Sequence, residues 1–129
     1  MDLHRAVFSW QNLLLTTIFL FVNILIDFNI SIIMADQLIK IFKALSDQTR
    51  IDMVRELLKK NSEQSCQSLS GKSDKSQPTL SHHFNKLLDA GVIKVRKKGT
   101  ENFYKVDEDF LNELGINIEQ LVTKGGSKK

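Results

Sequence analysis

A sharp change in composition near residue 34 limits what this chain of 129 residues can fold into. Residues 1–34 hold one Arg, no Lys and two acids, and the run 13–26 is apolar apart from two Thr and one Asn. The 95 residues that follow carry 17 basic and 13 acidic side chains, a net charge of +4. A stretch of that size can bury one small core. We therefore expect a single folded domain after the apolar segment.

Three interpretations of residues 1–34 stay open. In the first, Met34 is the true start and the segment is upstream sequence, because Phe, Ile, Leu and Asn are what AT-rich codons encode. In the second, the segment is a membrane anchor, although burying Asp27 in mid-membrane would cost about 3 kcal/mol. In the third, it is an extra helix packed on the domain. We favour the first, and Ile32-Ile33-Met34 lacks the small residues of a signal-peptide cleavage site.

Apolar spacing in residues 35–123 predicts a mainly α-helical fold with a small β-hairpin, a winged helix-turn-helix. The expected helices cover 36–45, 48–60, 65–71 and 77–90. Either Ser46 or Asp47 can cap the second of these. The last begins after Ser76, carries Pro78 in its first turn and ends before Gly91. Its expected buried face is Leu80, Phe84, Leu87 and Leu88.

The rest of the chain predicts the wing and the closing helices. Residues 92–96 and 103–106 read as two strands joined by a turn over 97–102. Residues 108–122 predict one or two helices split near Gly115, and 124–129 a disordered tail. The apolar residues that those helices carry are Phe110, Leu111, Leu114, Ile118, Leu121 and Val122.

Basic and acidic residues lie in different parts of the predicted domain. Residues 72–105 hold eight basic and three acidic side chains, whereas residues 106–123 hold five acids and no base. A basic helix and hairpin are where a nucleic acid would lie. The acidic end has the wrong sign for phosphate contact, and we interpret it as a dimer face.

The outward face of helix 77–90 and the hairpin provide the candidate DNA-binding residues. Short polar side chains at the front of a helix suit base edges in the major groove, and basic side chains suit phosphates. The alternative is an ordinary solvated helix face. We favour it less, because the segment also has an N-cap, Pro78 in the first turn, a short preceding helix and a basic hairpin after it. The candidates are Ser76, Gln77, Thr79, Ser81, His82, Asn85, Lys86, Arg96, Lys97 and Lys98.

Few other residues in the sequence are candidates for metal binding, redox chemistry or catalysis. His83 lies at the edge of the apolar stripe, so we expect a packed, hydrogen-bonded histidine rather than a ligand. Cys66 is the only thiol, and it is either a small packed side chain, which we favour, or a redox switch. We expect no metal site, no cofactor and no enzymatic activity, because no nucleophile–base set, glycine-rich phosphate loop or HExxH motif is present.

Two stretches resemble the ArsR-type family of winged-helix repressors. Residues 42–51, Phe-Lys-Ala-Leu-Ser-Asp-Gln-Thr-Arg-Ile, are similar to its opening signature. Residues 76–93 are similar to its recognition helix and the start of its wing, and residues 99–104 to its wing turn. The resemblance covers about residues 36–123.

The resemblance implies a cytoplasmic homodimer, joined through the first and last helices of the domain. It would repress transcription from a near-palindromic operator in double-stranded DNA until an unknown inducer binds. Gln77, Thr79, Ser81 and His82 match the family's DNA-reading positions. The chain departs from the metal-sensing members, because the thiolate motif falls at 65–68 with one Cys, and the last helix carries acids but no His.

Two further functions stay open as alternatives. One is a protein-interaction module that keeps the winged helix without reading DNA. The other is a membrane-tethered regulator that uses residues 1–34, which leaves a membrane among the possible partners.

Overall fold

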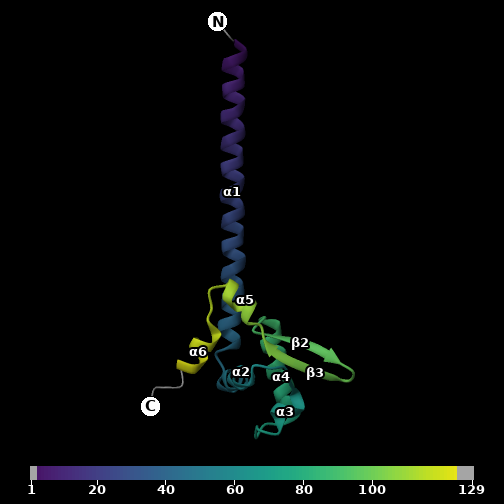
Figure 1. Cartoon of the computed structure of the whole chain (residues 1–129). Helices are drawn as coiled ribbons and strands as arrows, with labels where there is room; N and C mark the ends of the chain where they lie inside the picture. Colours follow the sequence, from purple (N-terminus) through teal and green to yellow (C-terminus); the bar gives the residue numbers. More distant parts are fainter. Residues whose placement is uncertain (1–2, 125–129) are drawn as a thin grey trace. The chain divides into compact units, whose positions relative to one another are not determined.

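The structure, a computed structural model, describes residues 3–124, and the chain divides into two units, Met1–Asp36 and Gln37–Lys129 (Figure 1). The predicted tail after residue 124 lies outside the described residues. Helix α1 (Leu3–Ala44) makes up the described part of the first unit and continues into the second. The predicted helix 36–45 is therefore the last part of a longer helix. The described side chains from residue 9 to residue 36 are all exposed.

The second unit contains five further helices and three strands among the described residues. Those helices are α2 (Gln48–Lys60), α3 (Cys66–Ser70), α4 (Gln77–Asp89), α5 (Glu108–Glu113) and α6 (Ile118–Lys124). The strands are β1 (Gln64–Ser65), β2 (Ile93–Lys98) and β3 (Glu101–Val106). Their order is that of a helix-turn-helix followed by a wing, as predicted (Figure 1).

The sheet has three strands, so the prediction of a two-stranded hairpin was incomplete. Strand β3 lies in the middle and pairs antiparallel with β2 on one side and β1 on the other. Residues Gln64 and Ser65 show no strand pattern of their own, and they pair because β3 offers them an open edge. The turn is also shorter than predicted, since only Gly99 and Thr100 lie outside the strands.

One core joins all these helices to the sheet. Its completely or almost completely buried members come from α1, α2, α4, α5 and the start of the wing: Ile41, Val54, Leu57, Leu80, Phe84, Leu87, Val92 and Leu111. Ile118 and Val122 of α6 are also buried, whereas Leu121 of the same helix is 46% exposed. Leu121 thus leaves an apolar side chain on the surface of the last helix.

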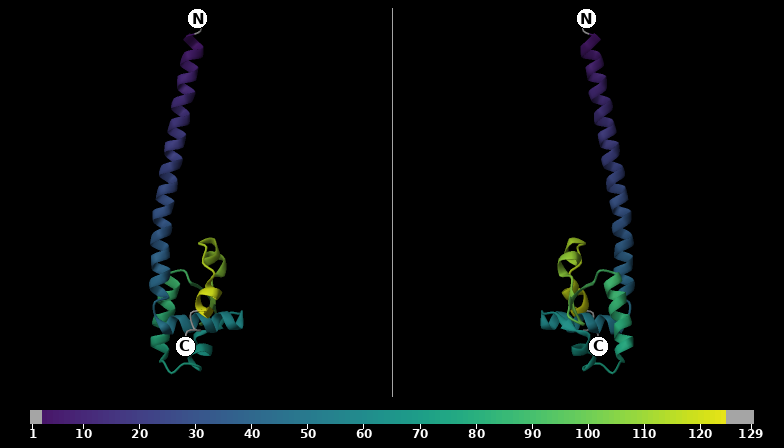
Figure 2. Two further views of the ribbon diagram at one scale, coloured as in Figure 1. Left: turned by 90° about the vertical axis from the view of Figure 1, so that its left-hand side faces the viewer. Right: turned by 90° about the vertical axis from the view of Figure 1, so that its right-hand side faces the viewer.

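The end of α1 is attached to the end of α4. Both views of Figure 2 draw these two stretches next to each other, and Gln37 Nε2 donates to the Ala90 carbonyl oxygen at 2.8 Å. Gly91 then reverses the chain with a φ of +76°. This is the left-handed residue that follows many helices. The wing therefore starts directly from the C-terminus of α4, as predicted.

Candidate nucleic-acid interface

Residues at its own N-terminus determine where helix α4 begins. Ser76 is its N-cap in an extended conformation, and its hydroxyl lies 2.8 Å from that of Thr79 rather than on the helix backbone. Pro78 occupies the first turn, where a missing N–H leaves no intrahelical bond unmade. The N-terminal end therefore keeps backbone N–H groups available, which is the end that recognition helices present to DNA.

The inward face of α4 fixes its direction. Leu80, Phe84 and Leu87 are at most 1% exposed. The ring of Phe84 stacks on that of Tyr104 in β3, with centroids 4.0 Å apart and planes 14° apart. A stacked aromatic pair adds to the burial of its two rings. Helix α4 and the sheet of the wing are thus held to each other at the centre of the domain.

The outward face of α4 is polar, and the structure places every predicted contact residue of this helix on the surface. Each of these side chains is exposed and none belongs to the core: Ser76, Gln77, Thr79, Ser81, His82, Asn85 and Lys86. The set combines hydroxyls, amides and an imidazole with one Lys. This is the mixture of donors and acceptors that can read base edges in a major groove.

Helix α3 and the turn after it complete the helix-turn-helix. Ser65 caps α3 by accepting the Ser68 N–H on its hydroxyl oxygen at 3.1 Å, and Leu69 is buried in the core. Because Gln64 and Ser65 are also paired with β3, the start of α3 is tied to the wing. A polar turn over 71–75 leads to α4.

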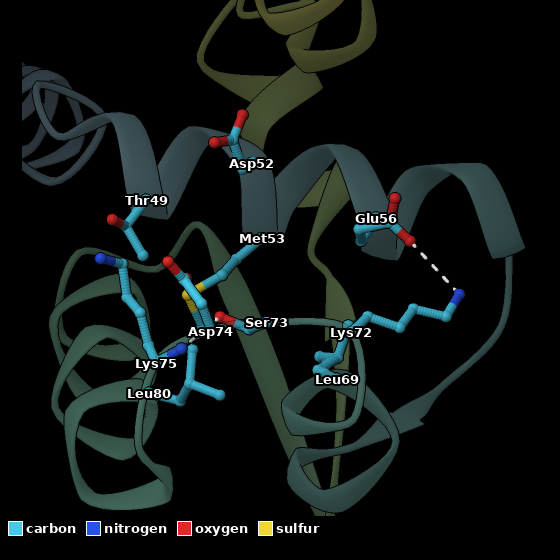
Figure 3. Close-up of a pocket in the computed structure, with 10 residues that line it drawn as sticks. All are labelled: Thr49, Asp52, Met53, Glu56, Leu69, Lys72, Ser73, Asp74, Lys75 and Leu80. Atoms are coloured by element: carbon cyan, nitrogen blue, oxygen red, sulfur yellow. Dashed lines mark hydrogen bonds and ion pairs between the residues drawn. The ribbon is translucent and has the colours of Figure 1, made fainter.

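A cavity of about 400 Å³ lies between α2 and this turn (Figure 3). Its apolar lining includes Met53, Leu69 and Leu80. At one end Lys72 Nζ lies 3.6 Å from a carboxylate oxygen of Glu56, so an ion pair links α2 to the turn. The hydrogen bond from Lys59, with the nearby Lys72 cation, lowers the pKa of Glu56, although burial opposes this.

The wing presents two lysines at its tip. Gly99 has a φ of +64° and Thr100 has no positive φ, which is the pattern of a two-residue type II′ hairpin loop. Lys97 and Lys98 precede this loop and are exposed. Within residues 3–124 neither forms an ion pair. Their ammonium groups are therefore available for a phosphate.

Arg96, the third predicted wing contact, is already engaged. Its Nε donates to both carboxylate oxygens of Glu63 at 3.0 Å, and its Nη2 donates to one of them at 2.5 Å. The guanidinium carbon also lies 5.9 Å from the centre of the Phe103 ring. The hydrogen bonds with Arg96 lower the pKa of Glu63, and the same bonds raise the pKa of Arg96. Arg96 thus connects β2 with the residue before β1.

A second arginine, which the sequence did not single out for a role, organises the start of the domain. Arg50 Nε donates to the Ala44 carbonyl oxygen at the end of α1, and Nη1 lies 3.4 Å from His83 Nδ1 on α4. Asp47 caps α2 by accepting the Arg50 N–H at 3.2 Å. The signature at residues 42–51 therefore joins three helices.

His83 is packed, as expected from its place beside the apolar stripe. Its side chain is 13% exposed, and its Nδ1 lies 3.9 Å from a carboxylate oxygen of Asp47. Burial lowers the pKa of His83, the Arg50 cation adds to this effect, and the Asp47 carboxylate opposes it. Burial also acts against the charge of Asp47, but hydrogen bonds from backbone N–H groups and the Arg50 cation leave its pKa lowered.

Cys66 lies half-buried at the start of α3. It lines a groove of about 290 Å³ together with Gln77, Ser81 and Asn102, which lie on α4 and the wing. Burial raises the pKa of the thiol. Since the thiolate is the reactive form, this environment reduces its reactivity. Among residues 3–124, no group of three or more His, Cys, Asp or Glu side chains could hold a metal ion.

A short helix, a polar turn, a second helix with an exposed polar face and a basic hairpin define a winged helix-turn-helix transcriptional regulator. Residues 47–95 match the family described as bacterial regulatory protein, arsR family. The chain belongs to this family, because it is also 40% identical over 82 residues to an uncharacterized helix-turn-helix transcriptional regulator of Methanocaldococcus jannaschii. That match covers 64% of this chain and 91% of the relative.

Two further comparisons agree with this result, the first on the family and the second on the fold alone. The chain is 33% identical to the arsenical resistance operon repressor of Staphylococcus xylosus, over 67% of this chain and 82% of that protein. The fold is similar to the solution structure of a homodimeric winged helix-turn-helix DNA-binding domain from Mycobacterium bovis, with a TM-score of 0.59 and 21% identity. That similarity covers 73% of this chain and 84% of the other. The chain is thus a DNA-binding regulator and not an enzyme.

Proposed function

We propose that the chain is a homodimeric repressor that binds a near-palindromic operator. The polar outer face of α4 carries this proposal, because its side chains are exposed while Leu80, Phe84 and Leu87 hold the opposite face in the core. In this proposal Gln77, Thr79, Ser81 and His82 read base edges, and Ser76, Asn85 and Lys86 contact nearby phosphates. The similarity to an operon repressor supports the direction of regulation.

The tip of the wing supplies the phosphate contacts beside the groove. Lys97 and Lys98 are exposed cations on an ordered hairpin, so they can lie along the backbone without a prior rearrangement. Arg96 contributes less than these two lysines, because Glu63 already neutralises its charge. We therefore assign Arg96 chiefly to support of the wing.

Two helices supply the proposed dimer surface. Ile39 and Phe42 are each 53% exposed near the end of α1, and Leu121 is 46% exposed on α6. Apolar side chains of this size on the first and last helices favour contact with a second copy. The acidic residues of α5 and α6 are unsuited to DNA, which is consistent with this use. A related fold from M. bovis is homodimeric.

The experiment is selection of bound sequences from a random duplex pool by the full chain in mild detergent. A homodimer with two α4 helices would enrich a motif of two inverted half-sites, with centres about 34–36 Å apart along the duplex. Enrichment of such a motif, together with repression of a reporter that carries it, supports the proposal. A folded chain that enriches no motif would instead favour the protein-interaction module. The regulator is proposed to act in the cytoplasm, where it meets DNA.

A further inference from the structure

We propose that residues 13–33 of α1 cross a lipid bilayer and hold the DNA-binding domain at the cytoplasmic face of a membrane. The helix Ser9–Ala44 is long and apolar enough to span a membrane, and its apolar window is entirely unburied in the chain. The 21 residues from 13 to 33 extend about 31 Å as an α-helix. The hydrocarbon layer of a bilayer is about 30 Å thick.

The distribution of apolar side chains fits lipid rather than a protein partner. Fifteen of these 21 residues are Leu, Ile, Phe or Val. The run from Ile18 to Val22 contains no polar residue, and five successive residues go more than once around a helix. Helix α4 is different, since its buried residues form one stripe and its other side is polar. A helix that is apolar on all sides suits a surrounding solvent of hydrocarbon chains.

Four of the six polar side chains within the segment donate a hydrogen bond to the backbone of their own helix. Thr16 and Thr17 donate to the carbonyl oxygens four residues earlier, at 2.7 and 2.8 Å. Asn23 and Asn29 do the same through their amide nitrogens, at 2.6 and 2.8 Å. A donor bonded within the helix needs no water, which is the requirement for polar groups in hydrocarbon. These four bonds therefore lower the cost of inserting the segment.

Asp27 is the one charged side chain within the segment. It lies six residues before Ile33, and six residues span about 9 Å along a helix. This position is about 6 Å from the middle of the segment at Asn23, so the carboxylate lies within the hydrocarbon layer and costs about 3 kcal/mol to insert. Because each Leu, Ile, Phe or Val favours insertion, fifteen of them outweigh the cost of one carboxylate.

The flanking residues give the orientation. Trp10 is exposed just before the segment, where aromatic residues of spanning helices meet the membrane surface. Residues 1–12 contain a single Arg, whereas the 20 residues after Ile33 contain Lys40, Lys43 and Arg50. Basic residues accumulate on the cytoplasmic side of a spanning helix. The DNA-binding domain would therefore face the cytoplasm, which is also where operator DNA is found.

The test is flotation of the purified full chain with vesicles of uncharged phosphatidylcholine. We expect most of the chain to float with the vesicles and to resist extraction at high salt and high pH, while detergent releases it. The double variant Leu20→Arg, Ile24→Arg should float at least tenfold less. The matched control Ser62→Arg, Gln120→Arg adds the same charges at exposed positions of the domain and should float like the wild type. Uncharged lipid excludes attraction through the basic wing.

Expression of the full reading frame in bacteria provides the second measurement. The mass of the product should include residues 1–33, and protease should digest the domain in inverted membrane vesicles but not in intact cells. A soluble product that starts at Met34, a product cleaved after the apolar run, or a soluble oligomer that does not float would each overturn the proposal. Operator selection is measured on the same samples, so failure of the anchor and failure of DNA recognition are distinguishable.

Discussion

Arg96 and Glu63 join the two outer strands of the wing across its middle strand. The guanidinium of Arg96 on β2 binds the carboxylate of Glu63, which directly precedes β1, and it lies over the ring of Phe103 on β3. Arg96, Phe103 and Ser65 are register partners across the three strands. The ion pair therefore acts as a brace over one face of the sheet, and Arg96 is not a free cation.

This relationship predicts how the basic residues of the wing differ in their salt dependence. Each phosphate contact adds about 0.9 to the slope of log affinity against log salt concentration. Because the proposed homodimer carries two copies of each lysine, Lys98→Ala and Lys97→Ala should each reduce the slope by about 1.8 and should weaken binding to all DNA sequences equally. Arg96→Ala should reduce it much less, and Glu63→Gln, which releases the guanidinium, should increase it. Titrations at several salt concentrations measure these slopes. An equal reduction by Arg96→Ala and Lys98→Ala would assign Arg96 to the phosphates.

Gln77 is predicted to read a base rather than the backbone. Gln77→Ala should cost about 1–3 kcal/mol of binding free energy in each half-site of the selected operator and should relax the preference at one position of each half-site. The slope of affinity against salt should stay unchanged. Gln120→Ala, which removes an exposed amide from α6, is the control and should leave both quantities as they are. A uniform loss on all sequences would instead place Gln77 among the phosphate contacts.

Substitutions at Gly91 and Gly115 can be compared for their effect on the free energy of unfolding. Gly91 has a φ of +76° and Gly115 a φ of +77°, and a left-handed backbone costs an L residue about 1–2 kcal/mol. A Cβ at Gly91 would lie 2.7 Å from Cε1 of Phe110, whereas a Cβ at Gly115 would meet no atom within 4 Å. Gly91→Ala should therefore lower the free energy of unfolding by about 1–3 kcal/mol more than Gly115→Ala. Urea denaturation compares the two, and equal losses would show that Phe110 moves aside.

His83 predicts a pH dependence of stability. Its pKa is lowered in the folded domain, so the unfolded chain binds a proton more readily. The contribution of neutral His83 to the free energy of unfolding is therefore fully present above the unfolded pKa of about 6.5. It is lost as the pH falls through the folded pKa. The free energy of unfolding should decline over this range, and His83→Gln should flatten the decline. His82→Gln changes an exposed histidine of the same helix and serves as control. Identical pH profiles for wild type and His83→Gln would exclude His83 as the cause.

Cys66 is predicted to be a poorly reactive thiol. Burial raises its pKa, so alkylation by iodoacetamide near pH 8 should be slower than that of free glutathione. Operator affinity should survive both a mild oxidant and the substitution Cys66→Ser. Cys66 lines the same groove as Gln77, so oxidation of the thiol could disturb a residue that we propose reads DNA. A loss of binding on oxidation that Cys66→Ser prevents would identify Cys66 as a redox switch.

Local signals in the sequence predicted the recognition helix well. Ser76 stands at the N-cap position, Pro78 and Gly91 each act on their own stretch of backbone, and the apolar stripe of α4 follows helical spacing. These features need no knowledge of the rest of the fold. The same holds for Asp47 as the cap of α2, one of the two caps considered.

Features that depend on distant partners were not predicted. Strand β1 is two residues long and exists because β3 offers an edge. The brace joins residues 33 positions apart, and Arg50 reaches His83 over the same separation. Leu121 has the spacing of a core residue but lies on the outside of α6. In each case the partner that decides the outcome is remote in sequence, so spacing alone carries no signal for it.

The strand order β1-β3-β2 leaves β2 as the long outer strand of the sheet. An exposed strand of six residues is a place where two molecules can pair by mistake and begin to aggregate. Lys97 and Lys98, which form no ion pair among the described residues, lie at the end of this strand, and their repulsion between copies opposes such pairing. The same positive charges that suit DNA thus keep the protein dispersed when no DNA is bound. Neutralising both lysines together would reduce solubility before any effect on operator binding could be measured.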